Sequence, residues 1–365
     1  MTHASGWLTP AVTDLHPTDS SRTIKSGWAR FRSFEVCPMP RLFALVCASL
    51  FLFHLDVAAQ TKSEPPKQTA PDRKKLLSGP VPGYKHRNIE GFDVFLQSKV
   101  LEHADDANFK RKPLDVLELE LNTITRSLPP NTVRLLRGIL IWVEWDDTDD
   151  PDYGKSVAKY YGVWGNAAMW SLRNDKHPGK ANNIEIISLK SLAREHQPGV
   201  KLERCVILHE LSHAVHLQLF GPNNPTIRAA YTQAMERKLY DQAEDVYGKK
   251  VKPYARANEK EYFAELSCAY LNKLHYFPFT RDDLKKHDLT GYKMMEATWG
   301  THKQIDALVK IENDKAAAKR LDKAKGLYQN KRTEEAVVAV EKLLEYYPTS
   351  KVATEAKALR EKWRQ

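Results

Sequence analysis

The feature that most restricts the fold is the segment CVILHELSHAVH at residues 205–216, which is apolar around an H-E-x-x-H sequence. A helix this apolar must be buried, and buried imidazole and carboxylate groups cost free energy unless they have partners. His209 and His213 are four residues apart, so a helix places both imidazoles on one face, where they can bind one Zn²⁺. The segment therefore predicts a buried helix that carries part of a metal site.

Glu210 directly follows the first histidine, which places its carboxylate near such a metal without making it a ligand. Zinc lowers the pKa of a bound water molecule towards neutrality, and a neighbouring carboxylate can then accept the proton. We therefore expect Glu210 to be the general base of a hydrolytic site.

Two histidines leave tetrahedral zinc one protein ligand short, because a catalytic site has three. Zinc sites of the metzincin type take a third histidine from the same helix, but Leu219 occupies that position here. The other solution is a glutamate on a later helix. Glu261 and Glu265 are four residues apart, so Glu261 can bind zinc while Glu265 accepts a hydrogen bond from a ligand histidine. Glu259 is the competing ligand, although Phe263, four residues later, cannot serve as its partner.

These residues resemble a known family. The H-E-x-x-H helix, the gap of several tens of residues and the block EYFAE at 261–265 resemble the gluzincin zinc metallopeptidases, especially the anthrax lethal-factor-like catalytic domain. That group has a tyrosine seven residues before the ligand glutamate, where it stabilises the oxyanion, and Tyr254 occupies this position. The resemblance covers residues 202–276 and extends only loosely to the upstream sequence. It implies one catalytic Zn²⁺ and a catalytic role for Tyr254.

The stretch EYFAELSCAYLNKLHYFPFTRDDL also resembles exported bacterial proteins that are classed as metallopeptidases. Alternatives without catalysis stay open for two of the residues. Asn258 can be a helix N-cap with Glu261 as its capping-box partner. Tyr254 can be a packing residue that precedes this cap.

The apolar patterns on either side of the motif predict an α+β fold. Residues 91–97, 139–145 and 183–188 have the alternation or the β-branched and aromatic content of strands. Helices are expected from Pro113 to about Leu128 and over residues 202–220, 226–247 and 258–273. Residues 84–314 are therefore expected to form a zincin-like domain, in which a small mixed sheet precedes the active-site helix and the glutamate helix.

The first 83 residues are expected to lie outside this domain. Residues 39–59 are typical of a signal peptide, because Arg41 precedes an apolar run that ends before the small residues Val57-Ala58-Ala59. A retained membrane anchor is the alternative, although the run is short for a span. We expect residues 1–38 to be an untranslated or extended N-terminus and residues 60–83 to be a linker. The protein would then be exported to the periplasm, the cell surface or the medium, without stable membrane insertion after cleavage.

Residues 315–365 are expected to form a tail of two helices with a break near Gln329-Asn330. Small residues and a Tyr-Pro-x-Ser break within 327–356 resemble one tetratricopeptide-type repeat, which cannot bury its apolar face alone and would pack on the domain or bind a partner protein. The tail holds 13 Lys and Arg against 7 Asp and Glu. This excess either attracts an anionic surface or is an ordinary solvated helix face. No basic-aromatic motif for nucleic acid is present, so no nucleic-acid partner is expected.

Three further features allow more than one interpretation. Cys205 and Cys268 can form a disulfide in an exported protein or be two small buried hydrophobes. His216 can contact the site or be an ordinary hydrogen-bonded histidine. Five aromatic residues can line a substrate cleft or belong to the core, and a segment within 161–174 is expected to supply an edge strand for substrate. The aromatic residues are Tyr160, Tyr161, Trp164, Trp170 and Trp299.

The sequence as a whole predicts a zinc-dependent endopeptidase that hydrolyses protein or peptide substrates with metal-activated water. In this hypothesis His209, His213 and Glu261 bind Zn²⁺, and Glu265 orients one histidine. The alternative is a catalytically idle zinc-binding exported protein whose helical tail mediates protein binding. An intact general base argues against this alternative, because a structural zinc site needs none.

Overall fold

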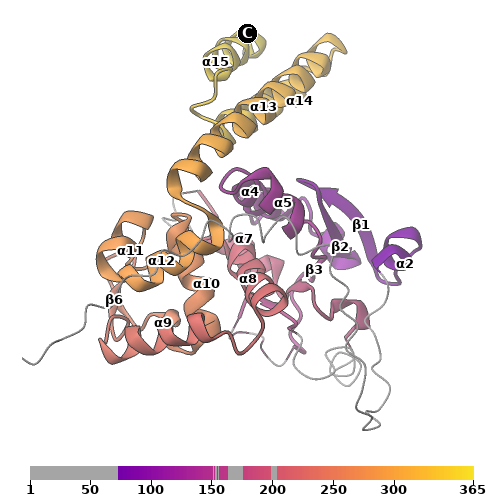
Figure 1. The fold of residues 1–365 in the computed structure, drawn as a ribbon. Coiled ribbons are helices and arrows are strands. Elements are labelled where there is room, and N and C mark those ends of the chain that lie inside the picture. Colours follow the sequence, from indigo (N-terminus) through magenta and orange to yellow (C-terminus); the bar gives the residue numbers. More distant parts are fainter. Residues whose placement is uncertain (1–72, 151, 153, 155, 163–175, 199–203) are drawn as a thin grey trace, which may run out of the picture. The chain divides into compact units, whose positions relative to one another are not determined.

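The structure is a computed structural model that describes residues 73–365 except 151, 153, 155, 163–175 and 199–203 (Figure 1). All of the described residues belong to one compact unit, Glu64–Gln365. The expected N-terminal extension, the signal peptide and most of the expected linker lie outside the described residues. Within that linker, however, residues 73–78 form a short helix, α2 (Arg73–Ser78).

A mixed sheet of five strands, in the order β1-β2-β3-β5-β4, forms the first part of the unit. The pairs β1–β2 and β4–β5 are antiparallel, whereas β2–β3 and β3–β5 are parallel. The predicted strands at 91–97, 139–145 and 183–188 are confirmed as β2, β3 and β5. The strands are β1 (Tyr84–Ile89), β2 (Phe92–Gln97), β3 (Ile141–Val143), β4 (Ala158–Tyr160) and β5 (Ile184–Ile186).

Neither edge strand of the sheet was predicted from the sequence. The side chains of β1 are exposed or half-buried along its whole length, so the strand has no apolar alternation that would reveal it. It joins β2 through a two-residue turn in which Glu90 (φ 51°) and Gly91 (φ 86°) are both left-handed, as tight β-hairpins require. The strand at the other edge, β4, has only three residues.

Helices lie between and after the strands and cover the sheet, which confirms the predicted α+β class. α4 and α5 flank the first strands, and α8, α9 and α10 follow the last one (Figure 1). The helices around the sheet are α3 (Ser98–Glu102), α4 (Pro113–Thr125), α5 (Pro130–Leu136), η1 (Pro178–Lys180), α7 (Leu189–Glu195), α8 (Val206–Val215), η2 (His216–Phe220), α9 (Pro225–Glu236), η3 (Tyr254–Arg256) and α10 (Glu259–Tyr270). The later helices are α11 (Arg281–His287), α12 (Leu289–Trp299), α13 (His302–Gln329), α14 (Thr333–Tyr346) and α15 (Ala353–Arg364).

The helix expected over 226–247 is wrong at its C-terminal end, because α9 stops at Glu236. Lys238 adopts a left-handed conformation (φ 56°), and the N–H of Leu239 bonds back to the carbonyl of Ala234. This arrangement is a Schellman motif, which ends a helix by satisfying its last carbonyl groups. The residues beyond form a short hairpin of β6 (Ala243–Glu244) and β7 (Lys250–Val251).

The C-terminal helices also differ from the prediction. α13 runs unbroken from His302 to Gln329, across the expected boundary at 314–315, and it is followed by two more helices rather than one. The predicted break near Gln329-Asn330 is confirmed, since Lys331 turns the chain with φ 60°. The three helices pack in pairs, α13 with α14 and α14 with α15. Their shared core contains Leu321, Ala324, Ala336, Val340, Leu343, Ala356 and Trp363.

The main hydrophobic core lies between the sheet and the helices that carry the H-E-x-x-H sequence and its later glutamates. α8 packs against β4 and β5 on one side and against α10 on the other. Ile184 and Ile186 of β5, Leu208 and Leu211 of α8, and Phe263 of α10 are fully buried in this core. The packing therefore brings two helices about 50 residues apart in sequence face to face. Among the described residues, no helix is long and apolar enough to cross a membrane.

Candidate metal centre

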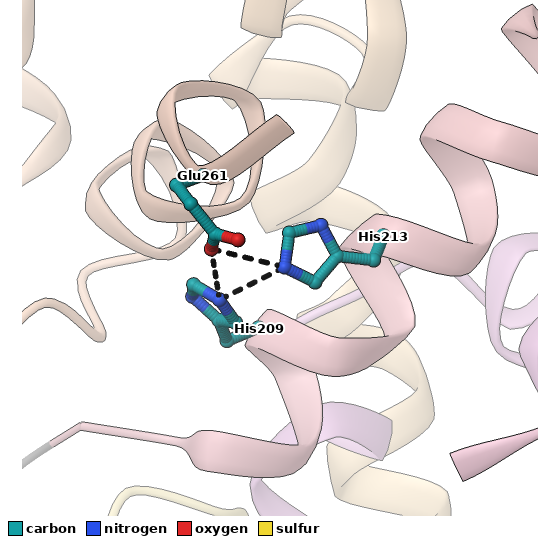
Figure 2. Close-up of side chains that lie close together, drawn as sticks. All are labelled: His209, His213 and Glu261. Carbon is teal, nitrogen blue, oxygen red and sulfur yellow. Dashed lines mark hydrogen bonds and ion pairs between the residues drawn. The ribbon is translucent and has the colours of Figure 1, made fainter. Parts of the chain in front are cut away.

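Helix α8 carries both histidines of the H-E-x-x-H sequence on the side that faces α10. His209 and His213 are one helical turn apart, and their rings meet edge to face with centroids 4.7 Å apart. Both side chains are largely shielded from solvent. Figure 2 shows the two rings turned towards a carboxylate from the neighbouring helix.

That carboxylate belongs to Glu261, in the first turn of α10. Asn258 is the N-cap of this helix, and its side-chain oxygen accepts the N–H groups of Lys260 and Glu261 at 3.0 and 3.1 Å. The cap predicted at Asn258 is therefore confirmed. The carboxylate of Glu261 does not complete a capping box, because it contacts both imidazoles instead.

Three donor atoms converge at this point with equal spacing. His209 Nε2, His213 Nε2 and Glu261 Oε2 each lie 3.1 Å from the other two (Figure 2). Donor atoms about 2.0–2.1 Å from a tetrahedral zinc ion lie about 3.3 Å from one another, so the triangle matches such a site closely. The three residues can therefore hold a metal ion. Two imidazoles and one carboxylate suit zinc, and also iron(II), so the donor set alone does not fix the ion.

The ionisation of Glu261 also suits a ligand. Burial opposes its charge, but the hydrogen bonds from His209 and His213 outweigh burial and hold the pKa of this carboxyl well below its usual range. Its oxygen thus faces the two ring nitrogens as a carboxylate, the form that binds a metal.

Glu265, one turn further along α10, lies against the opposite side of the His209 ring. Its Oε1 is 2.6 Å from His209 Nδ1, and its side chain is buried. Hydrogen bonding to this carboxylate keeps a ring proton on Nδ1, so Nε2 is the nitrogen that can offer its lone pair to a metal at the centre of the triangle. The structure therefore brings Glu265 to the position expected from the sequence.

Glu210 is buried, with 6 % of its surface exposed, and it lines the same cavity as the three converging side chains. Burial raises the pKa of its carboxyl, while the nearby imidazoles of His209 and His213 oppose this rise. The backbone of Tyr160, on the edge strand β4, lies close to this carboxylate. The helix and the sheet edge together place Glu210 beside the triangle of His209, His213 and Glu261.

Tyr254 lies in the short helix η3, just before the cap of α10. Its ring stacks near His209, with centroids 6.1 Å apart and planes inclined by 26°, and 54 % of the residue is exposed. Burial of the hydroxyl, followed by the charge of Glu261, raises its pKa to about 12. The phenol therefore remains protonated at neutral pH, lines the cavity and can donate a hydrogen bond there.

The cavity around these residues has a volume of about 940 Å³ and is lined by several elements. β4 contributes Ala158 and Tyr160, η3 contributes Tyr254, and further walls come from α7, α8, α10 and residues 273–276. This volume suits a peptide-sized ligand rather than a single small ion. The described part of the sheet edge at this cavity is β4, which lies just before the segment 161–174 that was expected to supply an edge strand.

Several residues considered from the sequence lie elsewhere. Glu259 does not face the triangle, because its carboxylate pairs with Arg228 at 3.4 Å. Cys205 and Cys268 are both free and buried, so the disulfide interpretation is wrong. Trp299 belongs to the core, while Trp164 and Trp170 lie outside the described residues.

Three other polar side chains contradict or refine the expectations. His216 is fully buried, and among the described residues neither of its ring nitrogens has a hydrogen-bond partner, so it is not an ordinary hydrogen-bonded histidine. Burial lowers its pKa to about 4, which keeps the ring neutral. Tyr160 accepts a hydrogen bond from Gln218 at 2.7 Å, and the hydroxyl of Tyr161 donates to Glu185 away from the triangle.

Sequence reasoning missed a buried glutamate that fixes the start of α8. Glu120 of α4 accepts the backbone N–H of Ile207 at 3.0 Å and the thiol of Cys205 at 3.1 Å. It thereby accepts a free N–H group in the first turn of α8, a helix whose own N-cap side chain makes no capping hydrogen bond. The signal was present, since Glu120 lies on the apolar stripe of its helix, three residues after Leu117 and four before Ile124.

The positive partner of Glu120 is His196, at the end of α7. Its Nε2 lies 2.9 Å from the Glu120 carboxylate, and its Nδ1 lies 3.0 Å from the carbonyl of Leu192. Both neighbours are acceptors, so the ring must donate from both nitrogens and is an imidazolium. Burial lowers the pKa of His196, but the contact with Glu120 outweighs burial and raises it.

A second group of acidic side chains, Asp147, Asp150 and Glu185, is close enough to hold a cation. The ammonium group of Lys176 already lies among them, 2.9 Å from Asp150 and 3.6 Å from Glu185, and it also pairs with Asp147. Lys180 adds a contact of 2.5 Å with Glu185. We therefore interpret this group as an internal salt-bridge network that holds the sheet edge rather than as a metal site.

Comparison of the chain with protein-family models, with curated proteins and with solved structures gave no match. Any conclusion about function therefore rests on the geometry of the site.

Proposed function

We propose that this protein is a zinc-dependent endopeptidase of the gluzincin type. The observation that carries the proposal is the equilateral triangle of His209 Nε2, His213 Nε2 and Glu261 Oε2, with 3.1 Å between each pair. It lies in a cavity that also contains the buried carboxylate of Glu210. An isolated structural site would need the ligands but not an additional carboxylate in a large open cavity.

Each residue has a distinct role in this proposal. His209, His213 and Glu261 would hold the zinc ion, and Glu265 keeps the proton of His209 on Nδ1. When bound there, zinc would supply Lewis acidity and lower the pKa of a coordinated water molecule. Glu210 would accept a proton, for which its raised pKa is suitable because it lies closer to the working pH.

Tyr254 would stabilise the negative charge that develops on the carbonyl oxygen of the substrate. Its hydroxyl is protonated and lines the cavity, and its ring lies beside His209. The donor would act most strongly in the transition state, when the oxygen is negative. Tyr254 is more than half exposed, so substrate binding can shield the interaction from water.

The edge strand β4 supports a polypeptide as substrate. β4 ends the sheet and lines the cavity beside Glu210, so an extended peptide can pair with its outer edge. A peptide in that position would place one of its carbonyl groups near the triangle. The proposal therefore extends to protein or peptide substrates and leaves their sequence preference open.

The test combines metal analysis with cleavage profiling. The purified protein would be incubated with a peptide mixture as isolated, after chelation, and after zinc or iron(II) is restored, and products would be identified by mass spectrometry. We expect cleavage that disappears with chelation and returns with zinc. Zinc binding without any cleavage would instead favour an idle zinc-binding protein.

Glu210→Gln and Glu195→Gln provide matched variants for this test. Glu195 lines the same cavity, but its carboxylate pairs with Arg204 at 2.9 Å and does not contact the triangle. Loss of cleavage only in Glu210→Gln would tie hydrolysis to the proposed base. Equal loss in both variants would point to a general disturbance of the cavity.

We also propose that the protein is exported and that its tail has a binding role. The export proposal rests on residues 39–59, and N-terminal sequencing of the mature protein would test it by showing a start at Gln60. In the tail, Lys342 pairs with Asp115 and Glu118 at 2.8 Å. The positive charge of the tail is thus partly used within the protein, and the remainder would attract an anionic surface or a partner.

A further inference from the structure

Tyr276 lies beyond the end of α10 and has no role in the site described so far. It is 2 % exposed, and its backbone forms an isolated bridge with Asp245, which directly follows β6 in the β6–β7 hairpin. Its hydroxyl oxygen accepts the backbone N–H of Ala255 at 3.0 Å. The same hydroxyl lies beside the carboxylate of Glu265, and both residues line the cavity of the proposed site.

The direction of these hydrogen bonds is fixed by what each group can offer. The backbone N–H of Ala255 can only donate, so the oxygen of Tyr276 accepts it. An ionised carboxylate can only accept, so the single proton of the Tyr276 hydroxyl is the one available for the neighbouring Glu265. Glu265 in turn accepts the Nδ1 proton of His209 at 2.6 Å.

The contacts close into a ring around the proposed site. The hydroxyl of Tyr276 lies beside Glu265, the carboxylate of Glu265 pairs with His209, and the ring of His209 stacks near Tyr254. Tyr254 is covalently joined to Ala255, whose N–H returns to Tyr276. One buried hydroxyl therefore contacts both the carboxylate that orients a proposed ligand and the backbone that carries the proposed oxyanion donor.

We propose that Tyr276 is a positioning residue that couples the orientation of His209 to the placement of Tyr254. Through Glu265 it keeps the lone pair of His209 Nε2 aimed at the metal, and through Ala255 it fixes the short helix that presents Tyr254. The inference rests on the proposed zinc site, and its effect on metal affinity does not require that the protein be a peptidase.

The first test measures zinc affinity by competition with a chromophoric chelator in Tyr276→Phe. Losing a residue that directly orients a metal ligand typically lowers metal affinity about 10–100-fold. Tyr276 acts on His209 only through Glu265, so we expect zinc binding that is about tenfold weaker, at the lower end of that range. Tyr240→Phe is the matched control. Tyr240 is equally buried, and its hydroxyl bonds to a different carboxylate, Asp288, at 3.1 Å.

A double-mutant cycle separates positioning from general destabilisation. If Tyr276 acts through Glu265, Tyr276→Phe should weaken zinc binding in the wild-type background but have little further effect in Glu265→Gln. Additive losses would overturn the proposed route. Zinc affinity within threefold of wild type in Tyr276→Phe, or an equal loss in Tyr240→Phe, would overturn the proposal itself.

The contact of Tyr276 with Ala255, which is the second branch of the proposal, is tested by peptide cleavage. Tyr276→Phe should lower kcat at saturating zinc, and it should have little further effect on kcat when Tyr254 is already phenylalanine. A full additional loss in the Tyr254→Phe background would overturn this branch. If wild type binds zinc but cleaves nothing, the proposed peptidase function fails, and the zinc measurements still decide the role of Tyr276.

Replacing Tyr276 with 4-aminophenylalanine keeps the inference testable if Tyr276→Phe does not fold. The aromatic amine retains an N–H that can donate to Glu265, but it is a poor acceptor for the N–H of Ala255. We expect nearly normal zinc affinity with a reduced kcat. Weakened zinc binding with an unchanged kcat would contradict the assignment of the two contacts.

Discussion

Replacing Glu261 by alanine tests the proposed ligand set most sharply, because Glu259 provides a control in the same turn of α10. Glu261 Oε2 lies 3.1 Å from the Nε2 atoms of His209 and His213. The carboxylate of Glu259 instead faces Arg228, 3.4 Å away. Only one of the two glutamates therefore contacts the imidazoles, although both carry the same charge and lie two residues apart.

The expected magnitude follows from the number of ligands that the protein supplies. Losing a side chain that merely orients a ligand lowers metal affinity about 10–100-fold, and losing one of three ligands should cost at least as much as the upper end of that range. We expect Glu261→Ala to weaken zinc binding by about 100-fold or more, which corresponds to about 2.7 kcal/mol. Glu259→Ala should retain affinity close to that of wild type.

The assay is competition for zinc against a chromophoric chelator at fixed pH, together with thermal unfolding in chelator to check that each variant is folded. A folded Glu259→Ala protein that loses zinc would show that the register of α10 is wrong. A folded Glu261→Ala protein that binds zinc within threefold of wild type would remove Glu261 from the ligand set.

Three other predictions address neighbouring residues. Glu210→Gln should keep bound zinc but lose nearly all hydrolysis, since the amide cannot accept a proton; activity near wild type would refute the general-base role. Tyr254→Phe should lower kcat about 10²–10³-fold with KM and zinc content nearly unchanged, because the bond forms as charge develops; a change below threefold would remove Tyr254 from the mechanism. The raised pKa of His196 means that its stabilising pairing with Glu120 is complete below the unfolded value of about 6.5 and is lost as pH rises through the folded pKa. The difference in Tm between wild type and His196→Gln should therefore shrink from pH 6 to pH 9, and a constant difference would contradict the imidazolium assignment.

The sequence predicted α8 and α10 well because their polar residues recur four positions apart within apolar helices. His209 with His213, and Glu261 with Glu265, each share a helix face, so the helical period alone places each pair. That these two faces meet could be expected only from the chemistry of a shared ligand. The packing of α8 against α10 bears out that expectation of contact.

The elements that escaped prediction depend on contacts distant in sequence. β1 is polar and exposed, and it is a strand only because it pairs with β2 along its whole length. The region after Glu236 has helical composition, but Asp245 accepts the N–H groups of Tyr247 and Lys249 and closes a hairpin turn instead. Such local side-chain bonds compete with a helix, and propensity does not register them.

Glu120 and Tyr276 illustrate the same limit within the site. Glu120 bonds to Ile207, 87 residues later, and Tyr276 bonds to Ala255 across an intervening helix. A charged residue on an apolar stripe signals that a buried partner exists, but it does not identify that partner. The residues that support the site were therefore less predictable than the residues that form it.

The arrangement of protons around His209 gives the strongest physical reason for a cation at the proposed site. Glu265 accepts a hydrogen bond from Nδ1 of His209, so Nε2 is the ring nitrogen that can offer a lone pair to a metal. His209 Nε2 faces the ionised oxygen of Glu261 and the Nε2 atom of His213, and the three atoms lie 3.1 Å from one another. Converging lone pairs in a buried site repel one another unless a proton or a metal lies between them, and burial makes the repulsion more costly. The buried carboxyl group of Glu210 lies beside them and makes a bound cation still more favourable. A divalent ion would remove the repulsion between the converging groups. We therefore expect metal binding and the stability of the α8–α10 interface to be thermodynamically linked.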